Sequence, residues 1–370
     1  MLSAIAAVHE LKATIPGLYL GCSQLPFATA ALGIGAVSWV LPAKCFRILD
    51  NFLYKTYMRT CLFVFENVSG VEISLYGDIG ELRKRQESVL VVSNHQSDVD
   101  WVVTVMLAAR QSPEGGEQMF RVMVKNAIHF VPLFGWYIYQ HGCIYVRRFG
   151  KFKREPVERQ LHYLSNMGEP YWLLIFPEGT RFTKKRPDAI AKSSNICNKV
   201  GIPEFKNVLI PKAGGFSLAL DGLTNDGNLD AIYDVTIGYG QTRQEGRHGR
   251  PPNMFEFVCG NPQFQNIHVH VRRFAVSEIP SDPEERKKWL TERYQEKDRM
   301  LDDFYAKGTM DDLYEKNAPR TSLSRTLLPA MVFGAALVAP IYSEYVRKAY
   351  CYTIASSPLL IVWLHLRGCV

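Results

Sequence analysis

A histidine and an aspartate five residues apart, His95 and Asp100, have the types and the spacing that chemistry on a ligand would need. They lie in the segment SNHQSDVD at residues 93–100, between an apolar run and an apolar helical pattern. Ser97 is a natural helix N-cap, and Asp100 would then take the third helical position, so a well-capped helix start is the alternative explanation. That alternative leaves His95 unexplained, because it lies on the loop at the carboxyl end of a strand, where open α/β sheets place ligands.

His95 and Asp100 would not share a face within one continuous helix. With His95 ahead of the N-cap, however, the Asp100 carboxylate can reach back and hold one imidazole nitrogen while the other nitrogen faces a substrate. A pair arranged in this way can act as a general base near neutral pH. The spacing therefore predicts proton transfer at this loop.

A second segment, FPEGTR at residues 176–181, also follows a predicted strand directly. Its proline ends the strand, Gly179 lets the backbone approach a ligand closely, and Arg181 can donate two hydrogen bonds to a phosphate. A turn built from proline and glycine is the alternative. Basic residues at 147–154 and 184–186 could meet anionic lipid or a phosphorylated substrate, with a solvated basic face as the alternative for the second group.

Strand and helix patterns that could position these segments alternate between about residues 70 and 275. The strands are expected at residues 88–93, 120–124, 143–147, 172–176, 208–210 and 233–238, and the helices at 98–110, 151–167 and 189–199. This alternation predicts an α/β fold with a largely parallel sheet and covering helices.

Two further elements are expected after this alternation. Residues 266–272 alternate like a half-exposed edge strand, which predicts that His268 and His270 lie on a solvated face. Ser281, followed three residues later by Glu284, has the form of a capping box that opens a charged helix. Its apolar stripe would consist of Leu290, Tyr294, Leu301 and Phe304.

Long uncharged stretches flank the predicted core. Residues 13–43 contain no Asp, Glu, Lys or Arg, and about 20 apolar residues suffice to span a bilayer. The stretches 326–343 and 349–366 are each about 18 residues long, and prolines weaken each of them as a straight span. We expect residues 1–65 to form an N-terminal membrane anchor region, 66–310 the central domain, and 311–370 a linker with one or two C-terminal membrane segments.

The composition and the absence of certain motifs argue against several classes of protein. The net charge of +7 is not accompanied by a zinc-finger or RNA-binding signature, so no nucleic-acid partner is expected. The eight cysteines are widely spaced without a C-x-x-C pair, which gives no indication of a metal site or a disulfide framework. No G-x-S-x-G segment or P-loop occurs, which argues against a serine hydrolase and a nucleotide-binding enzyme.

The two polar segments, in this order and about eighty residues apart, resemble the glycerolipid acyltransferase signature N-H-x-x-x-x-D followed by F-P-E-G-T-R. The segment GCIYVR at 142–147 is similar to the second block of that family. Ile210 and Pro211 match its fourth block, although Lys212 stands where the family has an apolar residue. The segments LY at 53–54, FEN at 65–67, LYG at 75–77 and DAIYDVT at 230–236, with the apolar C-terminal tail, are most similar to the epsilon-type 1-acylglycerol-3-phosphate acyltransferases.

This resemblance implies that residues 66–310 form an acyltransferase domain. It would esterify the sn-2 hydroxyl of 1-acylglycerol 3-phosphate (lysophosphatidic acid) to phosphatidic acid, with acyl-CoA as co-substrate and no cofactor. His95 would be the general base and Asp100 would orient it. The acceptor site would be shaped by Glu178, Gly179 and Arg181, and Arg147 would help to bind the glycerol phosphate. Lys125, just after a predicted strand, is either a second phosphate ligand or a surface lysine.

The sequence allows alternatives for the acceptor, for the class of protein and for the membrane. The acceptor could instead be another lysophospholipid or glycerol 3-phosphate, because the motifs specify the reaction and not the head group. A non-catalytic membrane scaffold is the alternative outside the enzymes, although intact His95, Asp100 and Arg181 argue against it. We expect a multi-pass protein of the endoplasmic reticulum membrane with its site facing the cytosol, and mitochondrial or nuclear-envelope membranes are alternatives.

Overall fold

An eight-stranded sheet lies at the centre of the computed structural model, which describes residues 2–147, 154–225, 227–244, 247–260, 266–311 and 313–366. Its order is β10-β1-β9-β6-β2-β5-β3-β4. The strands are β1 (Glu72–Gly77), β2 (Val89–Ser93), β3 (Phe120–Lys125), β4 (Ile144–Val146), β5 (Trp172–Ile175), β6 (Ala231–Tyr239), β9 (Asn266–Ala275) and β10 (Tyr314–Glu315). The pairs β1–β9, β2–β6, β2–β5, β3–β5 and β3–β4 are parallel, and β1–β10 and β6–β9 are antiparallel. The prediction of a largely parallel sheet is confirmed.

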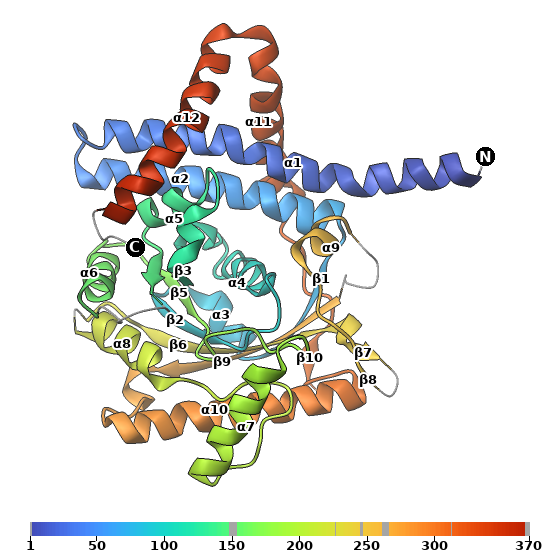
Figure 1. Ribbon diagram of the computed structural model, residues 1–370, viewed down its shortest axis with the longest axis vertical. Coiled ribbons are helices and arrows are strands. Elements are labelled where there is room, and N and C mark those ends of the chain that lie inside the picture. Colours follow the sequence, from blue (N-terminus) through green and yellow to red (C-terminus); the bar gives the residue numbers. More distant parts are fainter. Residues whose placement is uncertain are drawn as a thin grey trace.

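Helices cover both faces of this sheet (Figure 1). One face carries α1 (Leu2–Val37), α2 (Ala43–Leu62), α4 (Asp100–Ala108) and α5 (Gly135–Gln140), and the other α6 (Arg154–Ser165), α7 (Pro187–Val200), α8 (Ala213–Thr224) and α10 (Pro283–Lys307). Because successive side chains of a strand point to opposite faces, Val89 and Val91 enter the first core while Leu90 and Val92 enter the second. Strands covered on both faces need apolar residues at every position, which explains the apolar run before His95.

The edge-strand prediction for residues 266–272 is wrong. Strand β9 lies inside the sheet between β1 and β6, and His268 is 6% exposed. Its Nδ1 lies 2.6 Å from the Tyr76 hydroxyl, and burial lowers the pKa of His268 to about 4. His270 is half-buried. The prediction failed because β1, which supplies the missing neighbour, was not identified as a strand.

Smaller predictions also need correction. Residues 208–210 form no strand, and α4 is shorter than the helix expected at 98–110. The helix expected at 151–167 is observed from Arg154, and the basic residues Arg148, Lys151 and Lys153 lie outside the described residues. Two further short α-helices of the described residues are α3 (Ile79–Lys84) and α9 (Met254–Val258). Strands β7 (Arg243–Gln244) and β8 (Arg247–His248) pair as an antiparallel two-stranded ribbon.

Helix α10 covers the second face of the sheet as predicted, since Leu290, Tyr294, Leu301 and Phe304 are all buried. Its N-cap is Asp282 rather than Ser281, and the carboxylate accepts hydrogen bonds from the backbone N–H groups of Glu284 and Glu285. The Tyr294 hydroxyl donates to the carbonyl of Ser93 at 3.0 Å. The helix therefore holds the end of β2, immediately before His95.

Replacing Tyr294 with phenylalanine should lower the free energy of unfolding by about 1 kcal/mol, because it removes one buried hydrogen bond and leaves the ring in place. The shift should appear in thermal unfolding of the protein in detergent. Tyr345→Phe, which alters an exposed tyrosine, is the matched control and should have no effect. Equal unfolding of Tyr294→Phe and the wild type would show that this bond does not hold β2.

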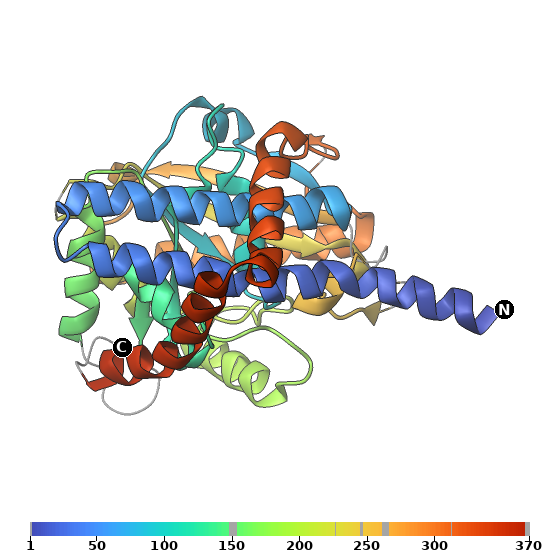
Figure 2. The same cartoon turned by 90° about the horizontal axis from the view of Figure 1, so that it is seen from above.

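In the part of the chain that the structure describes, three helical segments are long and apolar enough to cross a membrane: Thr14–Val37 within α1, Leu323–Tyr342 (α11) and Glu344–Leu366 (α12). They overlap the three uncharged stretches of the sequence. Helix α1 lies beside α2, and the hairpin of α11 and α12 crosses them (Figures 1 and 2). The Tyr19 hydroxyl donates to the carbonyl of Ala330 at 2.6 Å, which joins the two ends of the chain. The protein is therefore a membrane-associated one.

Candidate active site

The loop that carries His95 is fixed to the neighbouring strand by Asn94. This fully buried side chain donates to the carbonyl of Ile237 at 3.0 Å and accepts from the N–H of the same residue at 2.8 Å. Because β2 and β6 run parallel, with Ser93 opposite Val235, both strands end at the same edge of the sheet. Asn94 thus places His95 at the carboxyl edge, where the sequence predicted a ligand site.

Asp100 holds the imidazole as the spacing predicted. Its Oδ2 lies 2.8 Å from Nδ1 of His95 and also accepts the backbone N–H groups of Gln96 at 2.7 Å and Ser97 at 3.0 Å. Asp100 is the first residue of α4, with Val99 at the N-cap, so the alternative explanation, in which Ser97 is the N-cap and Asp100 the third helical residue, is not observed. The Ser97 hydroxyl instead accepts from the N–H of Val99 at 3.0 Å. The turn therefore serves the contact between Asp100 and His95.

Two aromatic residues complete this arrangement and were not predicted. The Tyr239 hydroxyl donates to Oδ1 of Asp100 at 2.5 Å, and burial raises its pKa well above the usual range, which keeps the hydroxyl protonated. The ring of Phe176 stacks on the imidazole with centroids 4.1 Å apart. The His95 side chain remains 20% exposed. With Nδ1 donating to Asp100, Nε2 is the nitrogen left to accept a proton.

Glu178 joins the two polar segments. Its Oε1 accepts from the backbone N–H of His95 at 2.8 Å, and its Oε2 accepts from that of Leu209 at 3.1 Å. Burial raises the pKa of Glu178, while these two N–H groups lower it. The carboxylate is 1% exposed and is not among the residues that line the cavity described below. Glu178 thus positions the His95 loop, and its direct contact with substrate stays a prediction.

Gly179 lies where a side chain would not fit easily. Its φ is +72°, a left-handed conformation that favours glycine. A Cβ there would come within 3.0 Å of Nζ of Lys212. The N–H of Lys212 donates to the carbonyl of Pro177 at 2.9 Å. Lys212, which stands where the family has an apolar residue, therefore packs against the FPEGTR turn.

A cavity of about 400 Å³ opens in front of His95. Three cations line it, namely Lys125, Arg181 and Arg186. Arg181 is half exposed, with Nη1 3.8 Å from Oδ2 of Asp98. The remainder is largely apolar and includes Tyr54, Trp101, Phe120, Val122, Val124, Ile128, Phe134 and Ile138. The structure therefore brings the imidazole, a cationic group and an apolar wall to one cavity.

Arg147 and Arg186 lie differently with respect to this cavity. Arg147 is not among the residues that line this cavity, so its contact with glycerol phosphate stays a prediction. Arg186 does line the cavity and donates to the Thr180 hydroxyl at 2.6 Å. Its neighbours Lys184 and Lys185 are exposed. Within the described residues, no group of three or more His, Cys, Asp or Glu side chains is placed to hold a metal ion.

The sequence of this chain is similar to those of known acyltransferases. The Acyltransferase family model matches residues 78–240, and the Acyltransferase C-terminus model matches residues 256–333. Over 367 residues the chain is 35% identical to 1-acyl-sn-glycerol-3-phosphate acyltransferase epsilon of Mus musculus, covering 97% of each chain. The chain belongs to the 1-acyl-sn-glycerol-3-phosphate acyltransferase family. The resemblance read from the two polar segments is thereby confirmed.

Other similar proteins share less of the sequence. The probable 1-acyl-sn-glycerol-3-phosphate acyltransferase 5 of Arabidopsis thaliana is 30% identical over 70% of this chain and 64% of its own. Lysocardiolipin acyltransferase 1 of Gallus gallus is 28% identical over 72% of this chain and 66% of its own. The crystal structure of the 1-acyl-sn-glycerophosphate (LPA) acyltransferase PlsC of Thermotoga maritima superimposes with a TM-score of 0.46 at 16% identity, over 80% of this chain and 98% of that chain.

Helix α10 also holds the strand ends that carry the site residues. Lys297 on α10 is fully buried, and its Nζ lies 2.5 Å from Oδ1 of Asp234 and donates to the carbonyl of Val235 at 2.6 Å. Burial lowers the pKa of this lysine, and the nearby Asp234 raises it. Together with Tyr294, Lys297 fixes the strand ends β2 and β6 that carry Asn94 and Tyr239. Neither residue was expected from the sequence to serve the site.

Proposed function

We propose that this acyltransferase moves an acyl group from acyl-CoA to the sn-2 hydroxyl of 1-acylglycerol 3-phosphate, releasing coenzyme A and phosphatidic acid. The observation that carries the proposal is the single cavity shared by His95, held through Nδ1, and the cations Lys125, Arg181 and Arg186. The imidazole can serve as a base for the hydroxyl that reacts, and the cations in the same cavity can bind the phosphate of this acceptor. The names of the family members cited above support the same reaction.

In this mechanism, Nε2 of His95 removes the proton of the acceptor hydroxyl as the oxygen attacks the thioester carbonyl carbon. A tetrahedral intermediate forms and collapses, so that the C–S bond breaks and the ester remains. The imidazolium returns its proton to the leaving thiolate. Asp100 stabilises the imidazolium through the bond at Nδ1, and the charge on its carboxylate matters most while His95 carries the extra proton.

A covalent enzyme intermediate is not required, because a thioester is already an activated acyl donor. The Cys143 thiol and the Ser97 hydroxyl line the cavity, and neither is set up to attack. Burial raises the pKa of Cys143 to about 11, which keeps it as the unreactive thiol. The Ser97 hydroxyl donates to the carbonyl of Pro252 and accepts from the N–H of Val99. Direct attack by the lipid hydroxyl is the simpler path.

The membrane helices fit this chemistry. Each substrate carries a long acyl chain, and burial of each methylene is worth roughly 0.8 kcal/mol, so extraction from the bilayer is costly. A site held at the membrane surface avoids that extraction, and the apolar cavity wall can receive an acyl chain. We place the enzyme in the endoplasmic reticulum membrane with its site toward the cytosol, where acyl-CoA is available. Fluorescence localisation of the tagged full chain tests this against mitochondrial and nuclear-envelope membranes.

A second acceptor class has its own support. Lysocardiolipin acyltransferase 1 shares 28% identity over 72% of this chain, so a larger lysophospholipid is the alternative acceptor. Purified protein in detergent, radiolabelled acyl-CoA and equal concentrations of lysophosphatidic acid, lysocardiolipin, lysophosphatidylglycerol and glycerol 3-phosphate decide between them. We expect the highest kcat/KM for lysophosphatidic acid. No transfer to any acceptor would favour a membrane scaffold and refute the proposal.

Arg181→Ala should raise the apparent KM for the acceptor about tenfold or more, the worth of a hydrogen bond to a charged group, with a smaller effect on kcat. The reason is that Arg181 lines the cavity and can pair with the phosphate. Lys184→Ala removes an equal charge from an exposed residue and serves as the control, with KM unchanged. An unchanged KM in Arg181→Ala would mean that the phosphate binds elsewhere.

A further inference from the structure

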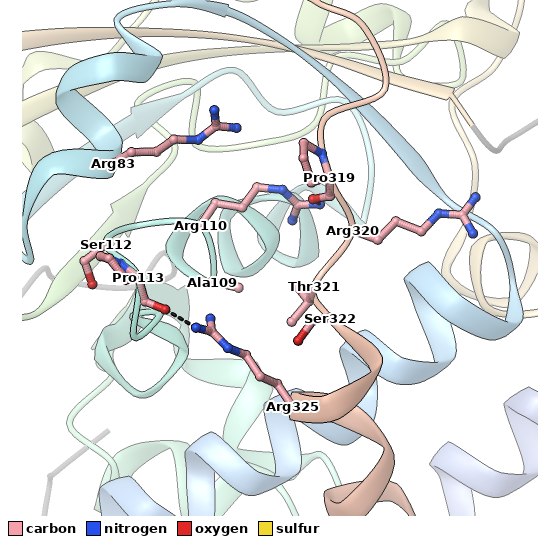
Figure 3. A pocket seen from close by; sticks show the side chains of 10 residues that line it. All are labelled: Arg83, Ala109, Arg110, Ser112, Pro113, Pro319, Arg320, Thr321, Ser322 and Arg325. Carbon is pink, nitrogen blue, oxygen red and sulfur yellow. Dashed lines mark hydrogen bonds between the residues drawn. The ribbon is translucent and has the colours of Figure 1, made fainter.

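A second cavity, of about 410 Å³, lies where the chain enters α11 (Figure 3). It is lined by four arginines from separate parts of the sequence: Arg83, Arg110, Arg320 and Arg325, which we call the arginine pocket. Figure 3 shows the side chains of Arg83, Arg110 and Arg325 near one another, whereas the side chain of Arg320 extends away from them. Among the described residues, this pocket and the cavity in front of His95 share no lining residue.

Hydrogen bonds made by the side chains of Glu66 and Arg110 hold the pocket together. Glu66, fully buried in the FEN segment, accepts from Nη1 of Arg110 at 2.8 Å and from the backbone N–H of Thr321 at 2.5 Å. Arg110 also donates to the carbonyls of Met106 and Pro319, each at 2.9 Å. These contacts tie the end of α4 to the segment that leads into α11. The pocket is thus a built feature and not a chance gathering of surface arginines.

Two buried polar atoms on the pocket wall have no hydrogen-bond partner in the described structure: Nε of Arg110 and Oγ1 of Thr321. The side chain of Arg110 is 7% exposed, and Thr321 is likewise 7% exposed. A buried donor left unpaired costs about 1–3 kcal/mol. Both atoms are donors that a bound acceptor oxygen would satisfy, so they point to an oxygen-rich ligand.

The charges in the pocket favour an anion. Arg110 is neutralised by Glu66, whereas Arg83 and Arg320 pair with Glu315 at 2.9 Å and Glu72 at 3.1 Å. Those two carboxylates are about a third exposed, and exposed ion pairs contribute little to stability. Within the described residues, no carboxylate lies within 4 Å of Arg325, which donates to the carbonyl of Pro113. Planar guanidinium forks match the oxygens of a phosphate.

The position of the pocket identifies the source of that phosphate. Thr321 and Ser322 directly precede α11, and Arg325 lies in its first turn, so the pocket is at the end of a candidate membrane span. Basic residues beside a membrane helix attract anionic lipid head groups. We propose that the arginine pocket binds the phosphate of an anionic phospholipid at the membrane surface and thereby fixes the entry of α11. This site is separate from the reaction proposed above.

Native mass spectrometry of the full chain in neutral detergent tests this proposal, with phosphatidylglycerol and phosphatidylcholine added in equal amounts. The wild type should retain phosphatidylglycerol preferentially. In Arg83→Gln/Arg325→Gln that preference should fall on the order of 30-fold, the effect expected for two surface cations on anionic-lipid attraction. Arg159→Gln/Lys287→Gln removes the same charge from two exposed residues and should retain the wild-type preference.

Further variants and a soluble competitor distinguish the proposed lipid site from other phosphate sites. Arg181→Ala should not change retention, which separates this pocket from the cavity in front of His95. Glycerol 3-phosphate at the same concentration as the lipid should not displace it, and displacement would identify a site for soluble phosphates and overturn the lipid assignment. If the double variant melts early, Arg325→Gln alone, which alters one half-buried side chain, replaces it. Equal retention of both lipids by the wild type, or equal loss in the control pair, would also overturn the proposal.

Discussion

Alanine at His95 should lower kcat by about 10³–10⁴-fold, the upper range for removal of a general base. The imidazole lines the cavity, and the only nitrogen committed to a described partner is Nδ1, bonded to Asp100. The backbone of His95 would remain held, because its N–H donates to Glu178 and its carbonyl accepts from Phe182 at 2.7 Å. The variant should therefore fold and bind both substrates. Initial-rate kinetics with radiolabelled acyl-CoA measure the loss.

The control for His95→Ala is His162→Ala, which removes an exposed histidine on α6. It should keep the wild-type kcat. Thermal unfolding in detergent should show that both variants retain the stability of the wild type, since a partly exposed loop imidazole contributes little to the core. Turnover within a few-fold of the wild type in His95→Ala would refute the role of His95 as the base.

Asparagine at Asp100 should lower kcat on the order of 100-fold while the loop geometry stays intact. Oδ2 accepts three N–H donors, from His95, Gln96 and Ser97, and the amide oxygen of asparagine can take its place. The amide NH₂ would then face the Tyr239 hydroxyl, which can rotate to accept instead of donating. The change therefore removes the negative charge that stabilises the imidazolium and keeps its orientation.

Comparison with Asp100→Ala separates charge from orientation, because alanine loses both and should reduce kcat further. Asp188→Asn alters an exposed aspartate at the start of α7 and should leave the rate unchanged. Wild-type kcat in Asp100→Asn would mean that the carboxylate only closes the turn before α4. The contact with His95 would then have no part in the reaction.

Local patterns predicted the elements that position the site. The apolar run of β2 and the polar loop after it were evident, because a strand covered on both faces must be apolar throughout and a loop that meets a ligand must not be. The contact between His95 and Asp100 followed from their spacing. Both residues lie in the short stretch between the end of β2 and the start of α4, so their contact does not depend on distant segments.

Contacts between distant segments could not be read in this way. Tyr239 and Asp100 are 139 residues apart, and Asn94 and Ile237 are 143 apart, so their pairing depends on the order of strands in the sheet. His268 was misplaced for the same reason, because its neighbour β1 comes almost two hundred residues earlier. Glu178 belonged to a recognised motif, yet its motif alone did not show that its carboxylate turns inward to hold the His95 loop.

In the proposed mechanism, the lipid hydroxyl itself attacks the thioester as His95 takes its proton, and no acyl group is carried by the enzyme. Incubation of the purified enzyme with radiolabelled acyl-CoA, in equimolar amounts and without acceptor, tests this directly. We expect no release of coenzyme A beyond slow hydrolysis and no label on the denatured protein, with transfer beginning only when lysophosphatidic acid is added. Release of one equivalent of coenzyme A together with a labelled protein that passes its acyl group to the added lipid would contradict the account.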